Sequence, residues 1–423
     1  MTPIVGVLSD QITTKWGKRK PWYVFGVFFV VPTFLGIFAY PAFVNYGKVR
    51  DDIRNAWYII LPALFNIGWA AVQISHMSIV NQLSGSNRMR DKLVNNRNGF
   101  TYAANITVLA FAVLMFKTVD EKTDQFRYMS FLCVGLGFMA SSFFMLTINE
   151  VQLSAEAKRL DTVYQQSISA GSLTMNSAAP LADDSSKDIS LDKTPAAIID
   201  EGEEDRTWKD WLKEGVFYIF GMVYMMVRIA INVTMTMQPF YLTKSTGFLA
   251  TEEDPTPVEL ALVPLISYIL SLIFSLFLQQ RLTRFLRNRF LPMLVAIVII
   301  VATSVPLAFL NESTQSYVYP LVGFQGIGLA IMLNTATSMI SDVVGKDAEN
   351  SAFVYGCYSL FDKFANGGLL FFLIDSYESD GEALKIIMSV TPIVCAVVSF
   401  ILTYLGAKFY SNKLAKITGV RTN

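Results

Sequence analysis

The chain has 423 residues, with 34 basic and 34 acidic side chains and a formal net charge of zero. Hydrophobic residues make up 53% and charged residues only 16%, whereas about 25% of the residues of a soluble domain are charged. A chain without net positive charge gives no sign of a nucleic-acid partner. The single histidine and three scattered cysteines argue against a zinc site. The composition therefore favours a membrane protein.

Ten apolar runs are candidates to cross a bilayer, which takes about 20 residues. Four of them precede residue 149, and six follow residue 207. In chain order they are 22–43, 57–80, 101–116, 128–148, 216–242, 260–278, 291–310, 317–340, 352–374 and 386–407. We therefore predict an all-α polytopic membrane protein with about ten full spans.

The runs divide the chain into two helix halves, residues 1–148 and 207–408. The segment 149–206 between them is rich in Ser, Asp, Glu, Lys and Ala, a composition typical of a disordered linker. Lys and Arg residues next to the spans place this linker and the tail, 409–423, in the cytosol. The first residues are typical of the last turns of a helix, so we expect a six-plus-six fold that lacks its first helix and most of its second.

Three charged residues lie inside these apolar runs. Arg228 falls within 216–242, and Asp362 and Lys363 fall within 352–374. Charges at membrane depth are rare and costly, and they usually face the protein interior or a water-filled path. The guanidinium of Arg228 offers a fork for a carboxylate, which is either that of a substrate or an internal acid such as Asp362. Asn232, four residues further on, shares its helix face.

The run 352–374 carries a polar stripe of Ser359, Asp362 and Asn366 on one helix face. Lys363 points about 100° away and is expected to meet another helix. A carboxylate here can titrate or bind a cation, and the neighbouring ammonium can replace that cation in the empty state. The alternative is a purely structural network.

A second polar stripe runs along 57–80, where Asn66, Gln73 and His76 share a face. His76 is the only histidine of the chain, and an imidazole can bind and release a proton near neutral pH. Its alternative role is a hydrogen bond to a neighbouring helix. Asn105 lies on a polar face of the run 101–116. We assign all these polar residues to a substrate or coupling-ion pathway.

The first loop has the pattern of a gating clamp. Asp10 ends the first helix, and a glycine and three cations follow it: Gly17, Lys18, Arg19 and Lys20. A carboxylate at a helix end and a basic loop can join neighbouring helices on the cytosolic face in one conformation and separate in the other. A basic loop that only fixes the topology is the simpler alternative.

Three segments resemble a known family: residues 17–22 after Asp10, residues 68–78, and residues 352–367. They are similar to the glycoside–pentoside–hexuronide:cation symporter branch of the major facilitator superfamily, and most of all to a eukaryotic subgroup that imports cysteine into lysosomes and melanosomes. The resemblance implies a six-plus-six helix fold and secondary active transport by alternating access. It implies a small polar solute, cysteine in that subgroup, and H⁺ or Na⁺ as coupling ion.

By the same resemblance we expect a lysosomal or related membrane, with lipid around the spans and no cofactor. The plasma membrane is the alternative location. The family's first helix, and the carboxylates of its second helix that bind a cation, have no counterpart in this sequence. Two other functions stay open: a cation-coupled sugar symporter, and a truncated scaffold or regulator that does not transport. Without a nucleophile–base pair or a metal cluster, we do not expect an enzyme.

Overall fold

The computed structural model describes residues 1–39, 50–82, 87–119, 121–156, 159, 208–248, 257–286, 290–344 and 351–418. Within these ranges the chain is helical apart from short turns and one isolated bridge between Thr14 and Gly17. The first half consists of the following helices: α1 (Thr2–Gln11), α2 (Lys20–Phe38), α4 (Asp51–Gln82), α5 (Asn87–Thr118) and α6 (Lys122–Thr147).

The second half begins with the short α8 (Trp208–Leu212) and the long α9 (Gly215–Lys244). The next helix is continuous through three segments: α10 (Glu259–Ile273), the π-helix η1 (Phe274–Leu278) and α11 (Gln279–Leu286). The remaining elements are α12 (Leu291–Leu307), the 3₁₀-helix η2 (Glu312–Tyr317), α13 (Val318–Val344), α14 (Ser351–Tyr377) and α15 (Gly381–Thr418).

In the part of the chain that the structure describes, all ten predicted runs correspond to helices, apart from one to three residues at the ends of the runs 22–43, 128–148 and 291–310. Eight helices of the described chain are long and apolar enough to span a membrane. The other two runs correspond to α12, which has 17 residues, and to α14, which has 27. Helix α14 is long enough to span a membrane, but its mean hydropathy is lowered by Asp362, Lys363 and Asn366. The multi-pass architecture predicted from the sequence is therefore confirmed.

The predicted linker begins later than residue 149. Residues 150–156 are helical, and Glu150 is buried because its carboxylate binds the loop before α2. Composition gave no sign of this contact, since it joins residues 130 positions apart. Of the predicted linker, residues 157–158 and 160–206 lie outside the described part of the chain.

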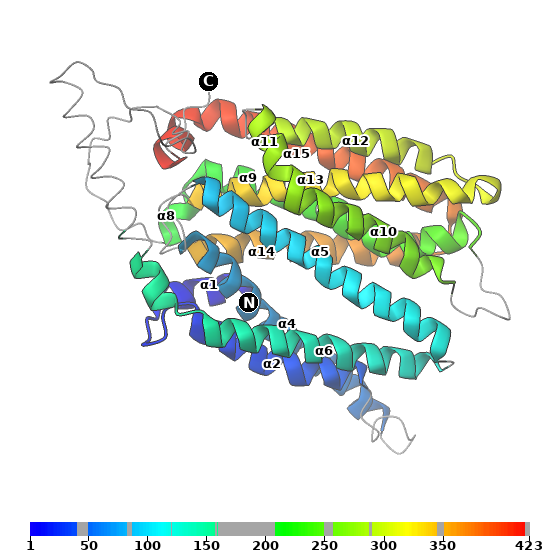
Figure 1. The fold of residues 1–423 in the computed structure, drawn as a ribbon, viewed down its shortest axis with the longest axis horizontal. Coiled ribbons are helices and arrows are strands. Elements are labelled where there is room, and N and C mark those ends of the chain that lie inside the picture. Colours follow the sequence, from blue (N-terminus) through cyan, green and yellow to red (C-terminus); the bar gives the residue numbers. More distant parts are fainter. Residues whose placement is uncertain are drawn as a thin grey trace, which may run out of the picture.

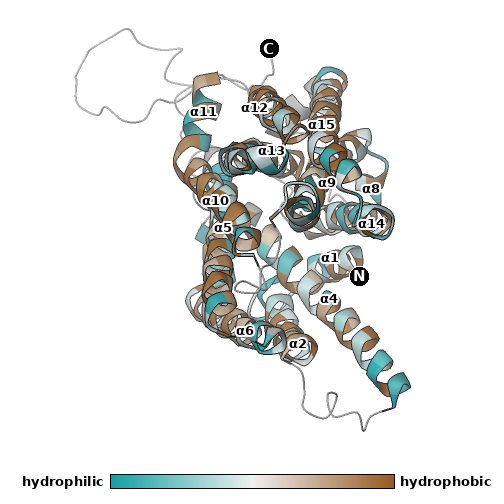
Figure 2. Ribbon diagram, turned by 90° about the vertical axis from the view of Figure 1, so that its right-hand side faces the viewer, coloured by the Kyte–Doolittle hydropathy of each residue, from teal (hydrophilic) through white to brown (hydrophobic). Residues whose placement is uncertain are grey.

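The helices form two groups that lie side by side (Figure 1; Figure 2). One group contains α2, α4, α5 and α6, and the other contains α9 to α15. Helix α13 is the most enclosed of the eight spans, whereas α6 is the least enclosed and exposes Phe131, Phe143 and Leu146. A continuous apolar exterior of this kind suits a lipid environment, where it needs no protein partner.

The first and second helix halves meet along α1–α14, α4–α14, α5–α10 and α5–α13. Helices α1 and α14 are in backbone contact, because a Cβ added at Gly6 would lie 2.6 Å from the carbonyl oxygen of Ala352. A Cβ added at Gly356 would lie 2.6 Å from the carbonyl oxygen of Thr2. Only glycine permits so close a crossing. We call the end of the bundle that carries Asp10, Arg19 and Phe353 the clamp end.

Candidate functional site

The centre of the site is an ion pair between α9 and α14. Arg228 Nε donates to Asp362 Oδ2 over 3.2 Å, and the Asp362 side chain is only 6% exposed. Asn366, one turn further along α14, donates from Nδ2 to Asp362 Oδ1 at 2.8 Å. Asn232 of α9 lies 3.5 Å from the same oxygen. The carboxylate thus has hydrogen-bond donors on both oxygens, and the internal-acid alternative for Arg228 is the one present in this structure.

The side chain of Lys363 extends toward the first helix half. Its Nζ lies 4.4 Å from the ring centroid of Trp69 on α4. An ammonium over an indole face is a cation–π contact, worth roughly 0.5–2 kcal/mol depending on its exposure. The offset of about 100° between Lys363 and the polar stripe of α14 therefore correctly predicted that Lys363 meets another helix. The contact connects the two halves at the depth of the ion pair.

His76 faces an arginine that the sequence analysis did not include in the pathway. Arg97 of α5 donates from Nε to His76 Nδ1 at 3.4 Å, and both side chains are half-buried. A nitrogen that accepts a hydrogen bond carries no proton, so the imidazole is neutral in this arrangement. The His76 ring also lies near the rings of Tyr23 and Phe144, at centroid distances of 6.4 and 5.4 Å.

Arg97 also interacts electrostatically with Arg228, and this interaction links the contacts of α4 and α5 to the ion pair. Its guanidinium is within electrostatic range of Arg228 and of the phenol groups of Tyr224 and Tyr355. Arg228 in turn interacts with Tyr224 and with Tyr102 of α5. Groups from α4, α5, α9 and α14 therefore surround one polar centre, which both halves of the molecule share. We call this set the central site: Trp69, His76, Arg97, Tyr224, Arg228, Asp362 and Lys363.

Some predicted pathway residues lie at the edge of this site. Gln73 is half-buried, and its Oε1 has no hydrogen-bond partner among the described residues. Ser359 is buried, and its Oγ likewise lacks a partner in the described chain. Asn66 is exposed and donates to the carbonyl of Pro62 in its own helix. Asn105 is half-buried and is two turns from Asn98 along α5. The structure thus brings neither Asn66 nor Asn105 into the central site.

The predicted clamp is assembled at the clamp end. Asp10 binds the guanidinium of Arg19, whose side chain is fully buried, and Arg19 NH1 also donates to Ser9 Oγ at 2.9 Å. The other oxygen of Asp10 accepts the backbone N–H of Phe353 at 2.9 Å. Phe353 lies in the first turn of α14, where backbone N–H groups are unpaired and attract a negative charge. Asp10 therefore joins the first helix half to the second.

Glu150, just beyond α6, holds the loop that carries the clamp. Its carboxylate accepts the backbone N–H groups of Lys18 and Arg19 at 3.0 Å and of Lys20 at 2.9 Å. Lys20 Nζ donates to the carbonyl of Ile148 at 2.9 Å. Gly17 has φ +107°, a left-handed conformation that starts this turn. Glu150 is not among the residues predicted from the sequence, although an acidic residue at the end of a span was an available signal.

A second connection between the halves is neutral. Asn98 Nδ2 of α5 donates to Asn334 Oδ1 at 2.9 Å and to Thr337 Oγ1 at 3.0 Å, both on α13. Asn334 Nδ2 continues to Ser275 Oγ in the π-helix η1 at 2.9 Å. Buried amides of this kind hold neighbouring membrane helices together. Their signal in the sequence was an asparagine inside an apolar run.

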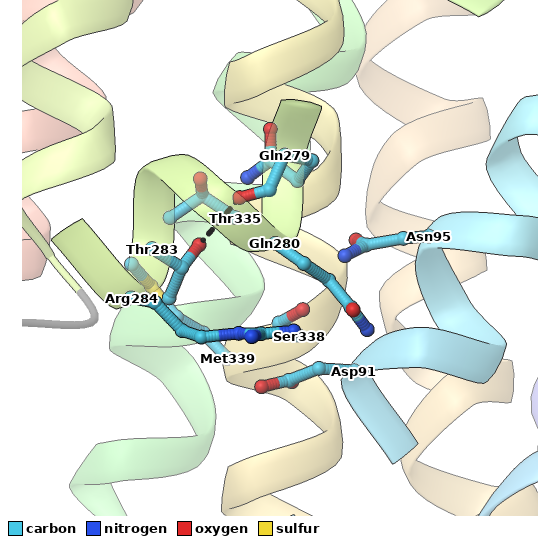
Figure 3. Close-up of a pocket in the computed structure, with 9 residues that line it drawn as sticks. All are labelled: Asp91, Asn95, Gln279, Gln280, Thr283, Arg284, Thr335, Ser338 and Met339. Carbon is cyan, nitrogen blue, oxygen red and sulfur yellow. Dashed lines mark hydrogen bonds between the residues drawn. The ribbon is translucent and has the colours of Figure 1, made fainter. Parts of the chain in front are cut away.

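Beside this network lies a small pocket of about 90 Å³ between α5, α11 and α13 (Figure 3). Asp91 and Asn95 extend from α5 toward Gln279, Gln280 and Arg284 of α11 (Figure 3). At roughly 30 Å³ per water molecule, it has room for a few waters but not for a solute with its hydration.

Comparison with known proteins agrees with this architecture. A family model described as MFS/sugar transport protein matches residues 1–173. Major facilitator superfamily domain-containing protein 12 of Mus musculus is 28% identical over 387 residues, which cover 86% of this chain and 72% of the relative. The protein of the same name from Homo sapiens is 28% identical over 391 residues, with the same coverage. Over most of its length this chain is thus similar to proteins of the major facilitator superfamily.

Solved structures share the fold of the major facilitator superfamily with this chain. A bacterial homologue of the iron transporter ferroportin in an outward-facing state has a TM-score of 0.59 and 15% identity, and covers 95% of this chain and 86% of its own. The proton:xylose symporter XylE has a TM-score of 0.56 and 12% identity, with 94% and 82% covered. The fold class predicted from the sequence is thereby confirmed.

Proposed function

We propose that this chain is a secondary active transporter that moves a small polar solute by alternating access of its two helix halves. The observation that carries the proposal is that both helix halves contribute residues to the central site. Its charged groups come from α5 in the first half and from α9 and α14 in the second, and Lys363 reaches Trp69 across the boundary. Substrate sites of secondary carriers lie near the bilayer midplane, where the two repeats meet.

The clamp supplies a second requirement of alternating access, which is a closed end that can open. Asp10 binds both Arg19 and the first turn of α14, so the clamp end is held shut by a contact between the halves. Helices α1 and α14 are in backbone contact at Gly6 and Gly356. Opening of the clamp end therefore has to separate these two helices as well as the contacts of Asp10.

The finer assignments rest on resemblance. Similarity to the cysteine-importing subgroup favours cysteine as solute and a lysosome-related membrane as location. A cation-coupled sugar symporter is the second candidate, since XylE, a proton:xylose symporter, shares the fold. For a coupling ion, His76 is the better candidate for H⁺ than Asp362 is for Na⁺, because donors already occupy both oxygens of Asp362.

The test is uptake by the purified full chain in proteoliposomes loaded with unlabelled solute. Labelled L-cysteine and labelled D-xylose are compared, with the Arg228→Gln variant and a Lys117→Gln control. Lys117 is exposed near the far end of α5, so its loss removes a cation without touching the central site. We expect uptake of cysteine that Arg228→Gln abolishes and Lys117→Gln retains. Uptake of xylose alone favours the sugar symporter, and no uptake of either solute by folded protein favours the scaffold.

A further inference from the structure

The imidazole of His76 offers one lone pair that both Arg97 and a proton can use. Arg97 Nε donates a hydrogen bond to His76 Nδ1 over 3.4 Å, and both side chains are half-buried. A proton on Nδ1 and the N–H of Arg97 exclude each other, because the nitrogen accepts only one hydrogen. The bond is weak, since it is longer than the usual range of about 2.7–3.2 Å. A proton can therefore replace it.

Two aromatic rings lie near the His76 ring. The Tyr23 ring of α2 lies at a centroid distance of 6.4 Å, and the Phe144 ring of α6 lies at 5.4 Å. The hydroxyl of Tyr23 donates to Ser141 of α6 at 3.2 Å, so the titratable group of α2 is engaged with another helix. Neither ring supplies a carboxylate that would hold a proton on His76.

The carboxylates on two of the elements that pack against α4 belong to ion pairs elsewhere. Helix α4 packs against α1, α2, α5 and α14. On α1 Asp10, and on α14 Asp362, bind arginines of their own. Lys363 of α14 contacts a tryptophan of α4 about two turns before His76. Within the described part of the chain, Arg97 of α5 is the one charged group that interacts with His76.

A proton on Nδ1 displaces Arg97. The imidazolium has N–H donors on both ring nitrogens and no acceptor, so Arg97 loses its hydrogen bond to His76. Two neighbouring cations also repel each other, and this repulsion is strong where water is scarce. The other acceptor bonded to Arg97 is Asn98 Oδ1, at 3.4 Å, and the phenols of Tyr224 and Tyr355 interact with Arg97 electrostatically. Protonation of His76 therefore moves Arg97.

Arg97 is adjacent to the residue that joins α5 to the second helix half. The amide oxygen of Asn98 accepts from Arg97, and its nitrogen donates to Asn334 at 2.9 Å and to Thr337 at 3.0 Å. Asn334 continues to Ser275 in the π-helix η1 at 2.9 Å. Single π-helical turns inside α-helices are frequent at functional sites. A displacement of Arg97 thus acts on the amide that connects α5 with α13.

We propose that His76 is the proton-binding site of this carrier, and that its proton displaces Arg97 and thereby loosens the contact of Asn98 with α13. This inference rests on the proposed transport function and adds the route by which a proton is coupled to it. A proton from water adds to the lone pair of Nδ1, Nε2 keeps its hydrogen, and the imidazole becomes a cation. Loss of that proton restores the acceptor for Arg97.

The single histidine makes the proton site directly measurable. A full chain that is purified without a histidine tag and labelled with ¹³C at histidine Cε1 gives one imidazole NMR signal, which reports the charge of His76. We expect one titration between about pH 4 and about pH 8. Arg97→Gln is expected to raise the proton affinity at least ~10-fold, because it removes the neighbouring positive charge. Lys117→Gln, on the same helix but exposed, is expected to leave the titration unchanged.

Circular dichroism and melting temperature show that each variant is folded. Absence of a titration of His76 in this range overturns the proposal. An unchanged titration in folded Arg97→Gln protein overturns it as well.

A cysteine at position 338 tests the connection to the boundary between the halves. Ser338 follows Thr337 on α13 and lines the small pocket between α5, α11 and α13 (Figure 3). In a chain without its native cysteines, Ser338→Cys should react faster with a small thiol reagent when α5 leaves α13. His76→Gln keeps an acceptor for Arg97 but takes up no proton. The ratio of the rates without and with His76→Gln therefore cancels the pH dependence of the thiol itself.

We expect this ratio to rise at least ~5-fold as the pH falls through the titration of His76. Asn98→Ala, which removes the contact with α13, should give a fast reaction on both sides of the titration. A ratio that stays constant across the titration overturns the proposed route.

Transport is scored separately from the proton site. Uptake of labelled L-cysteine into proteoliposomes is measured with and without a proton gradient, for the parent chain and for His76→Gln. We expect the gradient to drive uptake in the parent only. Uptake that ignores the gradient, or gradient-driven uptake by both proteins, overturns this inference and leaves the transporter intact. Proton binding and opening without uptake by either protein supports the proton site and contradicts the transport function.

Discussion

The carboxylate of Glu150 occupies the space that a side chain at position 17 would need. A Cβ added at Gly17 would lie 2.3 Å from Glu150 Oε2, and Gly17 has a φ of +107°. The same carboxylate accepts the backbone N–H groups of residues 18–20. One acidic residue beyond α6 thus fixes the loop that presents Arg19 to Asp10. The clamp depends on a residue that is not part of it.

Gly17→Ala is expected to disturb the clamp in two ways, through backbone strain and through a clash with Glu150. A left-handed conformation costs a non-glycine residue about 1–2 kcal/mol, and the added methyl displaces the Glu150 carboxylate. We expect a lower melting temperature and a lower transport rate than in the parent protein. Gly135→Ala is the matched control, because nothing lies within 4 Å of a Cβ added there. Equal melting temperatures for the Gly17 variant and the parent would show that the turn tolerates a side chain.

Asp10→Ala is expected to open the clamp end. It leaves the buried guanidinium of Arg19 without its acid, and loss of one partner of a buried pair commonly costs about 3–5 kcal/mol. It also removes the acceptor of the Phe353 N–H. Proteoliposome uptake should fall while protein abundance is measured in parallel. The double variant Asp10→Ala/Arg19→Ala should recover stability but not transport; if it recovers both, the pair is only structural.

Gly356→Ala is expected to force α1 and α14 apart. The added methyl would meet the carbonyl oxygen of Thr2 at 2.6 Å, a backbone atom that cannot move alone. Gly367→Ala on the same helix is the control, since nothing lies within 4 Å of its Cβ. The control should be neutral or more stable by roughly 0.5–1 kcal/mol, because alanine favours helix. We expect only the Gly356 variant to react faster with a thiol reagent at a cysteine introduced at Phe353.

The variants Arg228→Gln and Asp362→Asn test whether this ion pair takes part in transport or only holds α9 and α14 together. Each single change removes one partner of the ion pair and is expected to lower stability. The larger loss, about 3–5 kcal/mol, is expected for Arg228→Gln, which leaves the buried carboxylate of Asp362 without its cation. Transport should be lost in both variants and should stay lost in the double variant, in which the pair is removed but stability recovers. Uptake and protein abundance are measured together. Rescue of transport in the double variant would show that Arg228 and Asp362 serve only as a structural pair.

Gln73 is expected to face the solute pathway. A cysteine at position 73, in a protein whose three native cysteines are replaced, should react with small hydrophilic thiol reagents. Bound solute should slow the reaction, since Gln73 is one turn from Trp69, the residue that Lys363 contacts. A cysteine at buried Ile74 is the matched control and should stay unreactive. Failure of position 73 to react with any reagent favours a packing role for this stripe.

The sequence alone determined which segments are helices and which residues are charged within them. Both follow from local properties: an apolar run of about 20 residues identifies a span, and a charge inside it is visible without any contact. The polar residues of α14 were placed correctly on one face for the same reason, because helix periodicity fixes their directions. The clamp residues also followed from their local pattern.

The tertiary structure alone decided which of these groups meet. Arg228 and Asp362 are 134 residues apart, Asp10 and Phe353 are 343 apart, and Glu150 reaches a loop 130 or more residues before it. Arg97 entered the central site, and Asn66 and Asn105 stayed out of it, through the way whole helices pack. Periodicity gives the direction of a side chain from its own helix axis but not the position of the neighbouring helix. Packing also decided that Asp362 binds Arg228, whereas Lys363 contacts Trp69 of the other helix half.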